Sequence, residues 1–296
     1  MSDSNPRAVL SDLHELRPHI WVSDLILDWT CIAGLVGLYG ALGTPLWLLP
    51  VASLLIGARL HALGLLGHDV THRLLCRRRR LNDLAEVVTG WPLLIRLEGY
   101  RTWHFEHHRT LGSDRDPELS YRSDAVYQTP VPRGRVAILF LSDLLGLGLL
   151  DLLRFGREIL PEDRRRLAPI VLFWLALLAL AHWLDAVWVP LLLLWSVASG
   201  FWAVFRVRTW TEHVGADASG SASSHRFHAG PLARFLFFPH NTYCHFEHHM
   251  HPQVPYYNLP AVRERTPGRP VLSLRELFGQ LSANAEHPPL RAAHTG

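Results

Sequence analysis

Cysteine is scarce in this sequence of 296 residues, and the three that it has, Cys31, Cys76 and Cys244, show no paired spacing. That excludes a disulfide framework or a zinc ribbon as the basis of the fold. There is no GxGxxG nucleotide fingerprint and no cysteine-rich iron–sulfur pattern. The residues before Leu25 include several charges and no continuous apolar stretch, so we expect no signal peptide. A net charge of +3 gives no indication of nucleic acid binding.

The sequence is rich in long apolar runs, and 49% of its residues are hydrophobic. Each run is close to the roughly 20 residues that a helix needs to cross a bilayer. Buried helices of a soluble protein are the alternative, but four runs of this length favour membrane spans. The sequence therefore predicts an all-α integral membrane protein with about four transmembrane helices in two hairpins, at residues 25–43, 44–66, 167–187 and 189–207.

The spans divide the chain into three parts. Residues 1–24 are expected to be a cytosolic lead-in, residues 25–262 a membrane domain with a cytosolic helical cap, and residues 263–296 a cytosolic tail that is partly disordered. The apolar stretch Val136–Phe155 contains two aspartates and an arginine. We predict that it is an interfacial or partly re-entrant helix and no fifth span.

Two arginine blocks indicate the orientation. Arg77–Arg80 follows the second predicted span and Arg164–Arg166 precedes the third, whereas the link around Asp185 has no basic residue. Basic residues near span ends favour the cytoplasmic side. We therefore expect an inner or cytoplasmic membrane protein with both termini in the cytosol.

Histidines form three clusters at helical spacing. The first cluster is His68-Asp-Val-Thr-His72, and the second and third, His104–His108 and His245–His249, have the same sequence, His-Phe-Glu-His-His. Spacings of i, i+3 and i+4 place side chains on one helix face. Two identical pentapeptides and a related third cluster predict a shared metal site whose ligands are His68, His72, His104, His107, His108, His245, His248 and His249.

Imidazole ligands suit zinc, copper, nickel or iron, whereas calcium and magnesium prefer oxygen. A tetrahedral zinc needs four ligands, so this number of histidines is enough for two metal ions. Carboxylates beside the ligands could accept the second ring N–H and so orient the imidazoles; solvated charge on a helix face is the alternative reading of these groups. The candidates are Asp69, Glu106, Glu212 and Glu247.

The three clusters resemble the histidine boxes of the membrane-bound fatty-acid desaturases and hydroxylases. The resemblance includes Asp116-Pro117 after the second cluster, Glu212-His213 after the fourth span and residues 255–260 after the third cluster. It covers roughly residues 25–262 and implies a non-haem di-iron centre at the cytosolic surface of the membrane. It also implies that His213 is a further ligand, and that Asn241, His240 and His61 are ligands or groups that hydrogen-bond beside the metals.

This resemblance implies an O2-dependent oxidoreductase that desaturates a fatty acyl chain or lipid at an unactivated C–H bond. The alternative on the same scaffold is a hydroxylase of a lipid, carotenoid, hydrocarbon or specialised metabolite. Since the sequence shows no electron-transfer motif of its own, we expect a separate ferredoxin- or cytochrome-type donor. A metal transporter is a remote alternative, because it needs histidines along a path within the spans.

Overall fold

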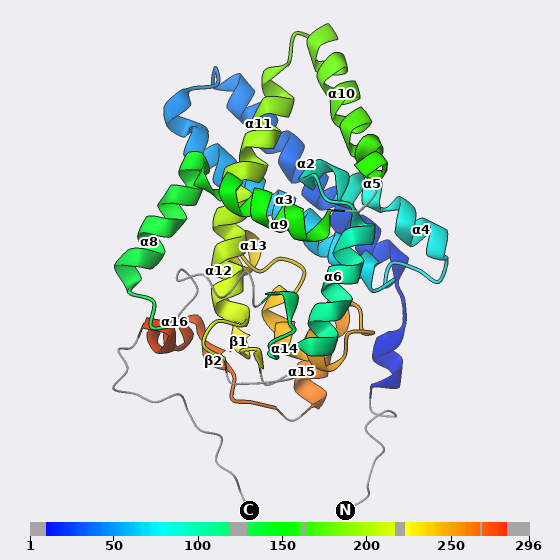
Figure 1. The fold of residues 1–296 in the computed structure, drawn as a ribbon, viewed down its shortest axis with the longest axis vertical. Coiled ribbons are helices and arrows are strands. Elements are labelled where there is room, and N and C mark those ends of the chain that lie inside the picture. The colour runs from blue at the N-terminus through cyan, green and yellow to red at the C-terminus, as the bar shows by residue number, and fades with distance from the viewer. Residues whose placement is uncertain (1–9, 119–128, 161–163, 217–222, 267, 283–296) are drawn as a thin grey trace, which may run out of the picture.

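The protein is a bundle of long helices with a cap of short helices at one end (Figure 1). The computed structural model describes residues 10–118, 129–160, 164–216, 223–266 and 268–282. Within these residues, helices dominate, in agreement with the all-α class expected from the sequence. The five helices in this part of the chain that are long and apolar enough to cross a membrane are Pro18–Ala41, Leu46–Thr71, Arg133–Ile159, Arg164–Trp183 and Trp188–Glu212.

Four of these helices lie where the sequence predicts spans, with shifted ends. The first helix begins at Pro18, where the fixed φ of proline suits the first turn of a helix. The long helices are α2 (Pro18–Ala41), α3 (Leu49–Thr71, after the 3-10 turn η2, Leu46–Leu48), α10 (Ala168–Trp183, after η5, Arg164–Leu167), α11 (Trp188–Ser196), the π-helical η6 (Val197–Phe201) and α12 (Trp202–Glu212). Of these, α3 is central, because it packs against α2, α11, η6 and α12.

The fifth candidate, Arg133–Ile159, is broken in the middle. It consists of α8 (Arg133–Ser142), the π-helical η4 (Asp143–Leu147) and α9 (Gly148–Ile159). Gly146 has a φ of 94°, and a Cβ there would lie 2.7 Å from the ring of Trp195. The chain therefore turns at this glycine, and α9 lies across α12 in Figure 1.

The charges inside this broken helix are paired with each other. Arg206 of α12 donates hydrogen bonds to Asp143, at 2.9 Å, and to Asp151. Arg206 and Asp143 are buried. The two carboxylates that interrupt the apolar run thus hold the broken helix against α12, because a buried charge is stable only with a partner.

Short elements build the cap and carry the histidine clusters. The described ends of the chain, in η1 and α16, lie at this end of the molecule (Figure 1). The elements are η1 (Ser11–His14), α4 (Arg79–Leu84), α5 (Glu86–Thr89), η3 (Trp91–Leu93), α6 (Leu97–Thr110), α13 (Pro231–Leu236), η8 (Thr242–Cys244), α14 (His245–Met250), η9 (Tyr256–Asn258), α15 (Leu259–Arg265) and α16 (Leu274–Ser282).

The predicted lead-in and tail both pack on the cap. Asn258 donates a 2.7 Å hydrogen bond to the carbonyl of Leu13. The strand β2 (Leu272–Ser273) pairs in parallel with β1 (Phe227–His228), and α16 buries Leu277 behind it. Residues 263–266 and 268–282 therefore belong to the folded cap, whereas residues 283–296 of the predicted tail lie outside the described residues.

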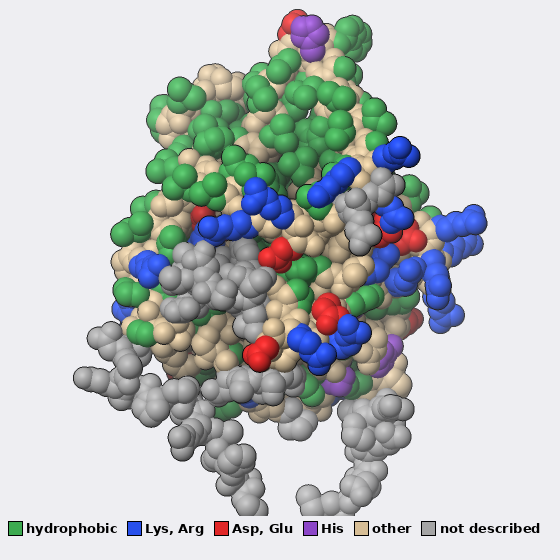
Figure 2. Space-filling view, in the orientation of Figure 1, with side chains coloured by type: hydrophobic (Ala, Val, Ile, Leu, Met, Phe, Trp, Pro, Cys, Tyr) green, Lys and Arg blue, Asp and Glu red, His purple; other side chains and the backbone are tan. Residues whose placement is uncertain are grey.

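Figure 2 shows hydrophobic side chains gathered over the end formed by α2, α10 and α11, with basic side chains along the border toward the cap. On α10 alone, Val171, Leu172 and Leu175 are each more than half exposed. A contiguous apolar surface of this kind marks contact with a membrane or a partner, and the length of the helices fits a membrane.

The crossing of α3 and η6 provides a test of this packing. A methyl group on Gly200 would overlap the carbonyl oxygen of Ser53, whereas a Cβ on Gly37 of α2 would have no neighbour within 4 Å. Overpacking costs about 1–3 kcal/mol, so Gly200→Ala should lower the thermal unfolding temperature of the purified protein and Gly37→Ala should not. An unchanged unfolding temperature in Gly200→Ala would contradict the close crossing.

Candidate metal centre

Four elements bring nine histidines together beneath the bundle. His68 lies in the last turn of α3 and His72 directly follows that helix. The second cluster occupies the last two turns of α6, and the third cluster forms α14. His213 directly follows α12. Each cluster is helical, as its spacing predicts, and the tertiary packing decides which rings meet.

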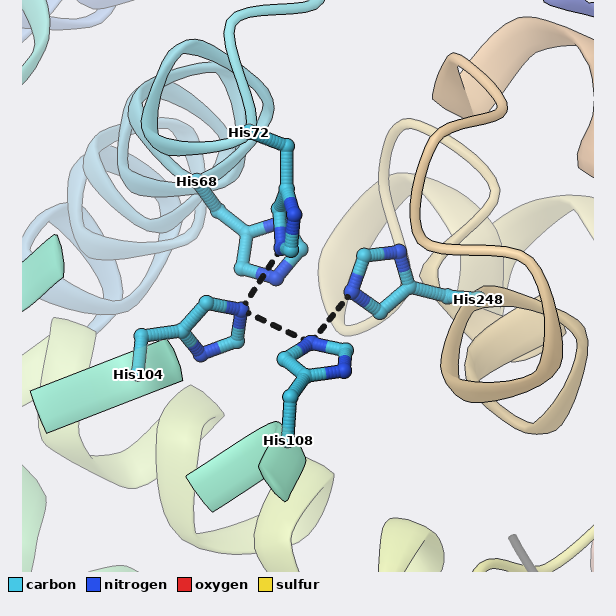
Figure 3. Close-up of side chains that lie close together, drawn as sticks. All are labelled: His68, His72, His104, His108 and His248. Atoms are coloured by element: carbon cyan, nitrogen blue, oxygen red, sulfur yellow. Dashed lines mark hydrogen bonds between the residues drawn. The ribbon is translucent and has the colours of Figure 1, made fainter. Parts of the chain in front are cut away.

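The first set, which we call the five-histidine group, draws on three helices (Figure 3). Its short contacts join the Nε2 atoms of neighbouring rings. These atoms are 2.8 Å apart between His72 and His104, 3.0 Å between His104 and His108, and 3.0 Å between His108 and His248. One ligand atom from each residue lies within 4.8 Å of all the others in the group, which comprises His68, His72, His104, His108 and His248.

The second set, the four-histidine group, lies beside the first. The Nε2 atom of His245 is 2.8 Å from that of His213 and 2.9 Å from that of His249. The group comprises His107, His213, His245 and His249, again within 4.8 Å of one another. Adjacent residues on α6 and α14 thus serve different groups, and the ring centroids of His108 and His249 are only 4.5 Å apart.

The geometry of both groups fits metal ions. A neutral imidazole has one N–H, so several Nε2 atoms that face a common point cannot all bond to each other. Two nitrogens that lie about 2.1 Å from one cation and at right angles to each other would be about 3.0 Å apart, close to the distances observed. Among the described residues, buried His68 Nε2 and His249 Nδ1 have no hydrogen-bond partner. An all-nitrogen donor set suits iron, zinc, copper or nickel.

Burial favours the neutral form of several rings in both groups. Loss of solvation lowers the pKa of His72, His104 and His245 well below the ordinary value, and the neighbouring histidines lower it further. The same causes lower the pKa of His108 to about 4. A neutral ring keeps the lone pair that binds a metal, so the electrostatics of the site favour ligation near pH 7.

Hydrogen-bond acceptors at the Nδ1 atoms hold two rings of the four-histidine group in place. His107 Nδ1 donates a 2.8 Å hydrogen bond to buried Asp116, and His213 Nδ1 donates one of 2.8 Å to the carbonyl of Ser223. Each bond leaves Nε2 free of its proton and directed into the four-histidine group. Glu212 Oε1 lies 3.5 Å from His245 Nδ1, so this predicted carboxylate is beside a ligand.

Two carboxylates of the site were not among the sequence candidates. Asp116 entered only as part of the Asp116-Pro117 resemblance, and its bond to His107 gives it a role. Glu118 has an oxygen 3.7 Å from His107 Nδ1 and 3.6 Å from His213 Nε2. In the sequence, these two residues stand out only by their position just after the second cluster. Nothing in the sequence shows that their loop packs against His213.

Glu106 and Glu247 were predicted to accept ring N–H groups, but both carboxylates lie away from the rings, so this prediction is wrong for them. Glu106 is on the opposite face of α6 and pairs with Arg109, because a residue two positions from His104 and His108 is rotated by about 200°. Glu247 forms ion pairs with Arg226, at 2.5 Å, and Arg263, at 2.8 Å. Glu247 therefore fixes α14 to neighbouring segments of the cap and does not orient a histidine ring.

His240 and Asn241 shape the loop before the third cluster instead of contacting either group. His240 Nε2 donates a 2.8 Å hydrogen bond to Asp28 of α2, which also pairs with Arg59 at 3.1 Å. Burial alone would lower the pKa of His240, but its bonds to Asp24 and Asp28 outweigh burial and raise it. Asn241 adopts a left-handed conformation (φ 55°) and donates to the carbonyl of Tyr256.

Asp69 and His61, the last two residues predicted to lie at the metal site, line cavities. Asp69 is buried beside His68 in a small cavity against His245, His248 and Tyr256. His61 is two turns before His68 on α3, outside both groups, and lines a second cavity. Neither belongs to the two histidine groups.

Fold and site define a mostly helical protein with several helices long and apolar enough to cross a membrane, and with two adjacent histidine-rich sites at one end of its bundle. The chain belongs to the fatty acid desaturase family, whose model matches residues 17–272. It is a membrane desaturase-like oxidoreductase, as the resemblance of the histidine clusters implied.

Several characterised relatives are desaturases. Dihydrorhizobitoxine desaturase from Bradyrhizobium elkanii is 27% identical over 289 residues, which cover 88% of this chain and 81% of the relative. An sn-1 oleoyl-lipid 12-desaturase from Anabaena variabilis is 32% identical over 112 residues, 36% of this chain and 32% of the relative. An sn-1 acyl-lipid omega-3 desaturase (ferredoxin) from Nostoc sp. (strain 36) is 32% identical over 90 residues, 29% and 25% of the two chains.

The hydrogen bond between His107 and Asp116 predicts that metal binding weakens when the carboxylate charge of Asp116 is removed. Loss of a carboxylate that orients a metal-bound histidine typically costs about 10–100-fold in metal affinity. Asp116→Asn should therefore retain less transition metal than the wild type in competition with a chelator. Asp114→Asn, an exposed aspartate in the same loop, is the control and should match the wild type; equal retention in both variants would contradict the role of Asp116.

The lowered histidine pKa values predict acid sensitivity of the metal-free protein. Unfolded histidines titrate at about 6.5, whereas His108 titrates at about 4 when folded. Between these values the unfolded chain binds more protons, so the free energy of unfolding decreases as the pH falls. The thermal unfolding temperature should fall from about pH 7 to about pH 5 and stay level above about pH 7.5; an increase on acidification would contradict buried neutral rings.

Proposed function

We propose that the nine histidines bind two iron ions and that the protein is an O2-dependent desaturase. One observation carries the proposal: five buried or half-buried imidazoles converge in one group and four in another beside it. The family membership supports non-haem iron. His68, His72, His104, His108 and His248 would hold one ion, and His107, His213, His245 and His249 the other.

Bound iron would supply the redox chemistry that activates dioxygen, which no side chain can supply. The reaction balances as follows. Two hydrogens leave adjacent carbons of the substrate and a double bond forms, while O2 takes up those hydrogens together with two electrons and two protons and becomes two waters. Since one electron pair comes from the C–H bonds, the other pair must come from an external donor.

The chain contributes position and protection. The acceptors Asp116 and Ser223 fix the rings of His107 and His213, so their Nε2 lone pairs keep one direction. His104, His107 and His248 are almost fully buried, which excludes bulk water from the centre. Rigid ligands and a dry site are the protein's part in such chemistry.

A separate ferredoxin- or cytochrome-type protein would deliver the electrons. A relative from Nostoc is named as a ferredoxin enzyme, which supports a donor of this kind. Basic side chains lie along the border between the apolar surface and the cap (Figure 2). The block Arg77–Arg80 follows α3 and includes the start of α4. Such a charge could attract an acidic donor and also the headgroups of anionic lipids.

We further propose four transmembrane helices, with α2, α3, α10 and the α11–α12 helix as the spans and the broken helix α8–α9 partly re-entrant. The break at Gly146 and the buried pairs with Arg206 support this arrangement. An even number of spans puts both termini on the side of the cap. The arginine blocks favour the cytoplasmic side of an inner or cytoplasmic membrane.

Hydroxylation is the second candidate reaction, because the same centre and the same electron supply would insert one oxygen atom instead of removing two hydrogens. The relatives bear different substrate names, dihydrorhizobitoxine in one case and acyl lipids in others. A lipid or acyl chain and a specialised metabolite therefore both agree with the family. A metal transporter does not fit, since the histidines close around two points at one end of the bundle.

Iron content and product analysis test the proposal together. His248→Ala removes one of the five ligands, so the protein should still insert in the membrane but hold less iron and form no product. Cells that express the wild type with dioxygen present should contain a lipid or metabolite that has lost two hydrogens, detected by mass spectrometry; a gain of one oxygen would favour the hydroxylase.

His228→Ala is the matched control, because His228 is an exposed histidine of the same cap. It should keep the iron content and the product of the wild type. Wild-type protein that binds no iron after reconstitution, or full activity in His248→Ala, would overturn the assignment of the centre.

A further inference from the structure

A second cavity opens between the bundle and the cap, next to the five-histidine group. It is enclosed by α3, η3, α6, α9, η6 and α12. Most of its lining is apolar, including Leu93, Leu97, Phe155, Phe201, Trp202 and Phe205. Apolar walls with a few placed polar groups are typical of a small-molecule site.

At one end, a single side chain separates this cavity from a histidine of the five-histidine group. Tyr100 lines it and stacks on the ring of His104, with the centroids 5.4 Å apart and the planes 16° apart. Arg208 lines both this cavity and the smaller one against His68, His245 and His248. Tyr100 and Arg208 would thus stand between a molecule in this cavity and the proposed iron centre.

The polar side chain that interrupts the apolar wall deeper in the bundle is His61. It lies seven residues before His68 on α3, which is roughly 10 Å along the helix axis. His61 is 1% exposed and contacts Phe201 and Phe205 with its ring, at centroid distances of 5.8 and 6.4 Å. Neither of its ring nitrogens has a hydrogen-bond partner among the described residues.

An imidazole in this position is unfavourable without a partner. A buried donor or acceptor that makes no hydrogen bond loses its solvation and gains nothing in return. Both nitrogens of His61 are in this state, in a wall that leucine or phenylalanine could complete. A ligand with a polar group at this point would restore the missing hydrogen bond.

We propose that this cavity binds the substrate and that His61 hydrogen-bonds a polar group on it. The substrate class is then an amphipathic chain with a hydroxyl, carbonyl or amide group on the part that lies in this cavity, away from the carbon that reacts. A plain saturated tail would leave His61 unpaired and bind less well. The placement of the reacting carbon rests on the proposed iron centre, whereas the contact with His61 does not.

The binding of two matched probes tests this assignment. Decanol and decane differ by one hydroxyl, and each is titrated into the iron-loaded protein in lipid nanodiscs while the thermal unfolding temperature is followed. Decanol should bind the wild type about tenfold more tightly than decane. His61→Phe should remove this preference, and His61→Gln, which keeps a donor and an acceptor, should retain part of it.

The control is His182→Phe, the same substitution at an exposed histidine of α10, and it should show the wild-type preference. Equal binding of the two probes to the wild type, or an unchanged preference in His61→Phe, would overturn the proposal. If His61→Phe does not fold, the decanol preference of the wild type and of His61→Gln tests the proposal instead. Neither probe needs to react, so a His61-dependent preference tests this site alone. Wild-type protein that binds no iron after reconstitution would overturn the proposed function without touching this preference.

Discussion

Facing ring nitrogens are the constraint on which the rest of the structure depends. Nε2 atoms of neighbouring imidazoles lie 2.8–3.0 Å apart in both histidine groups. Neutral rings cannot satisfy each other in this arrangement, and protonated rings would repel. Cations between the rings remove the conflict, because each lone pair then has a partner. The cap can be understood as the means of holding these rings in place before a metal binds.

Buried ion pairs connect the cap to the bundle. Asp28 of α2 pairs with Arg59 of α3 and accepts a hydrogen bond from His240, just before the third cluster. On the other side of α3, Arg206 holds Asp143 and Asp151 of the broken helix. Charges inside a membrane domain require such partners. The bond from His240 to Asp28 ties the loop before the third cluster to α2, whereas the pairs of Arg206 tie α12 to the broken helix.

The structure separates the histidines that would hold the metals from the side chains that line the larger cavity. The metal ligands come from the ends of helices and are packed ring against ring, which leaves little freedom to change them. The larger cavity is lined by side chains of both the bundle and the cap, and a substitution at His61 would change its polarity without altering either histidine group. His61 illustrates this separation, since it shares α3 with His68 but lies outside both groups. Relatives named for quite different substrates are consistent with such an arrangement.

The sequence by itself determined which helices form and which histidines could act together, because both depend on local periodicity. Apolar runs of membrane length and clusters at i, i+3 and i+4 are features of single segments. Only the tertiary structure decided how the nine rings divide into five and four, that Asp116 supports a ring and Glu106 and Glu247 do not, and that the helix turns at Gly146. These outcomes depend on contacts between segments as distant as α6 and α14, and local spacing does not encode them.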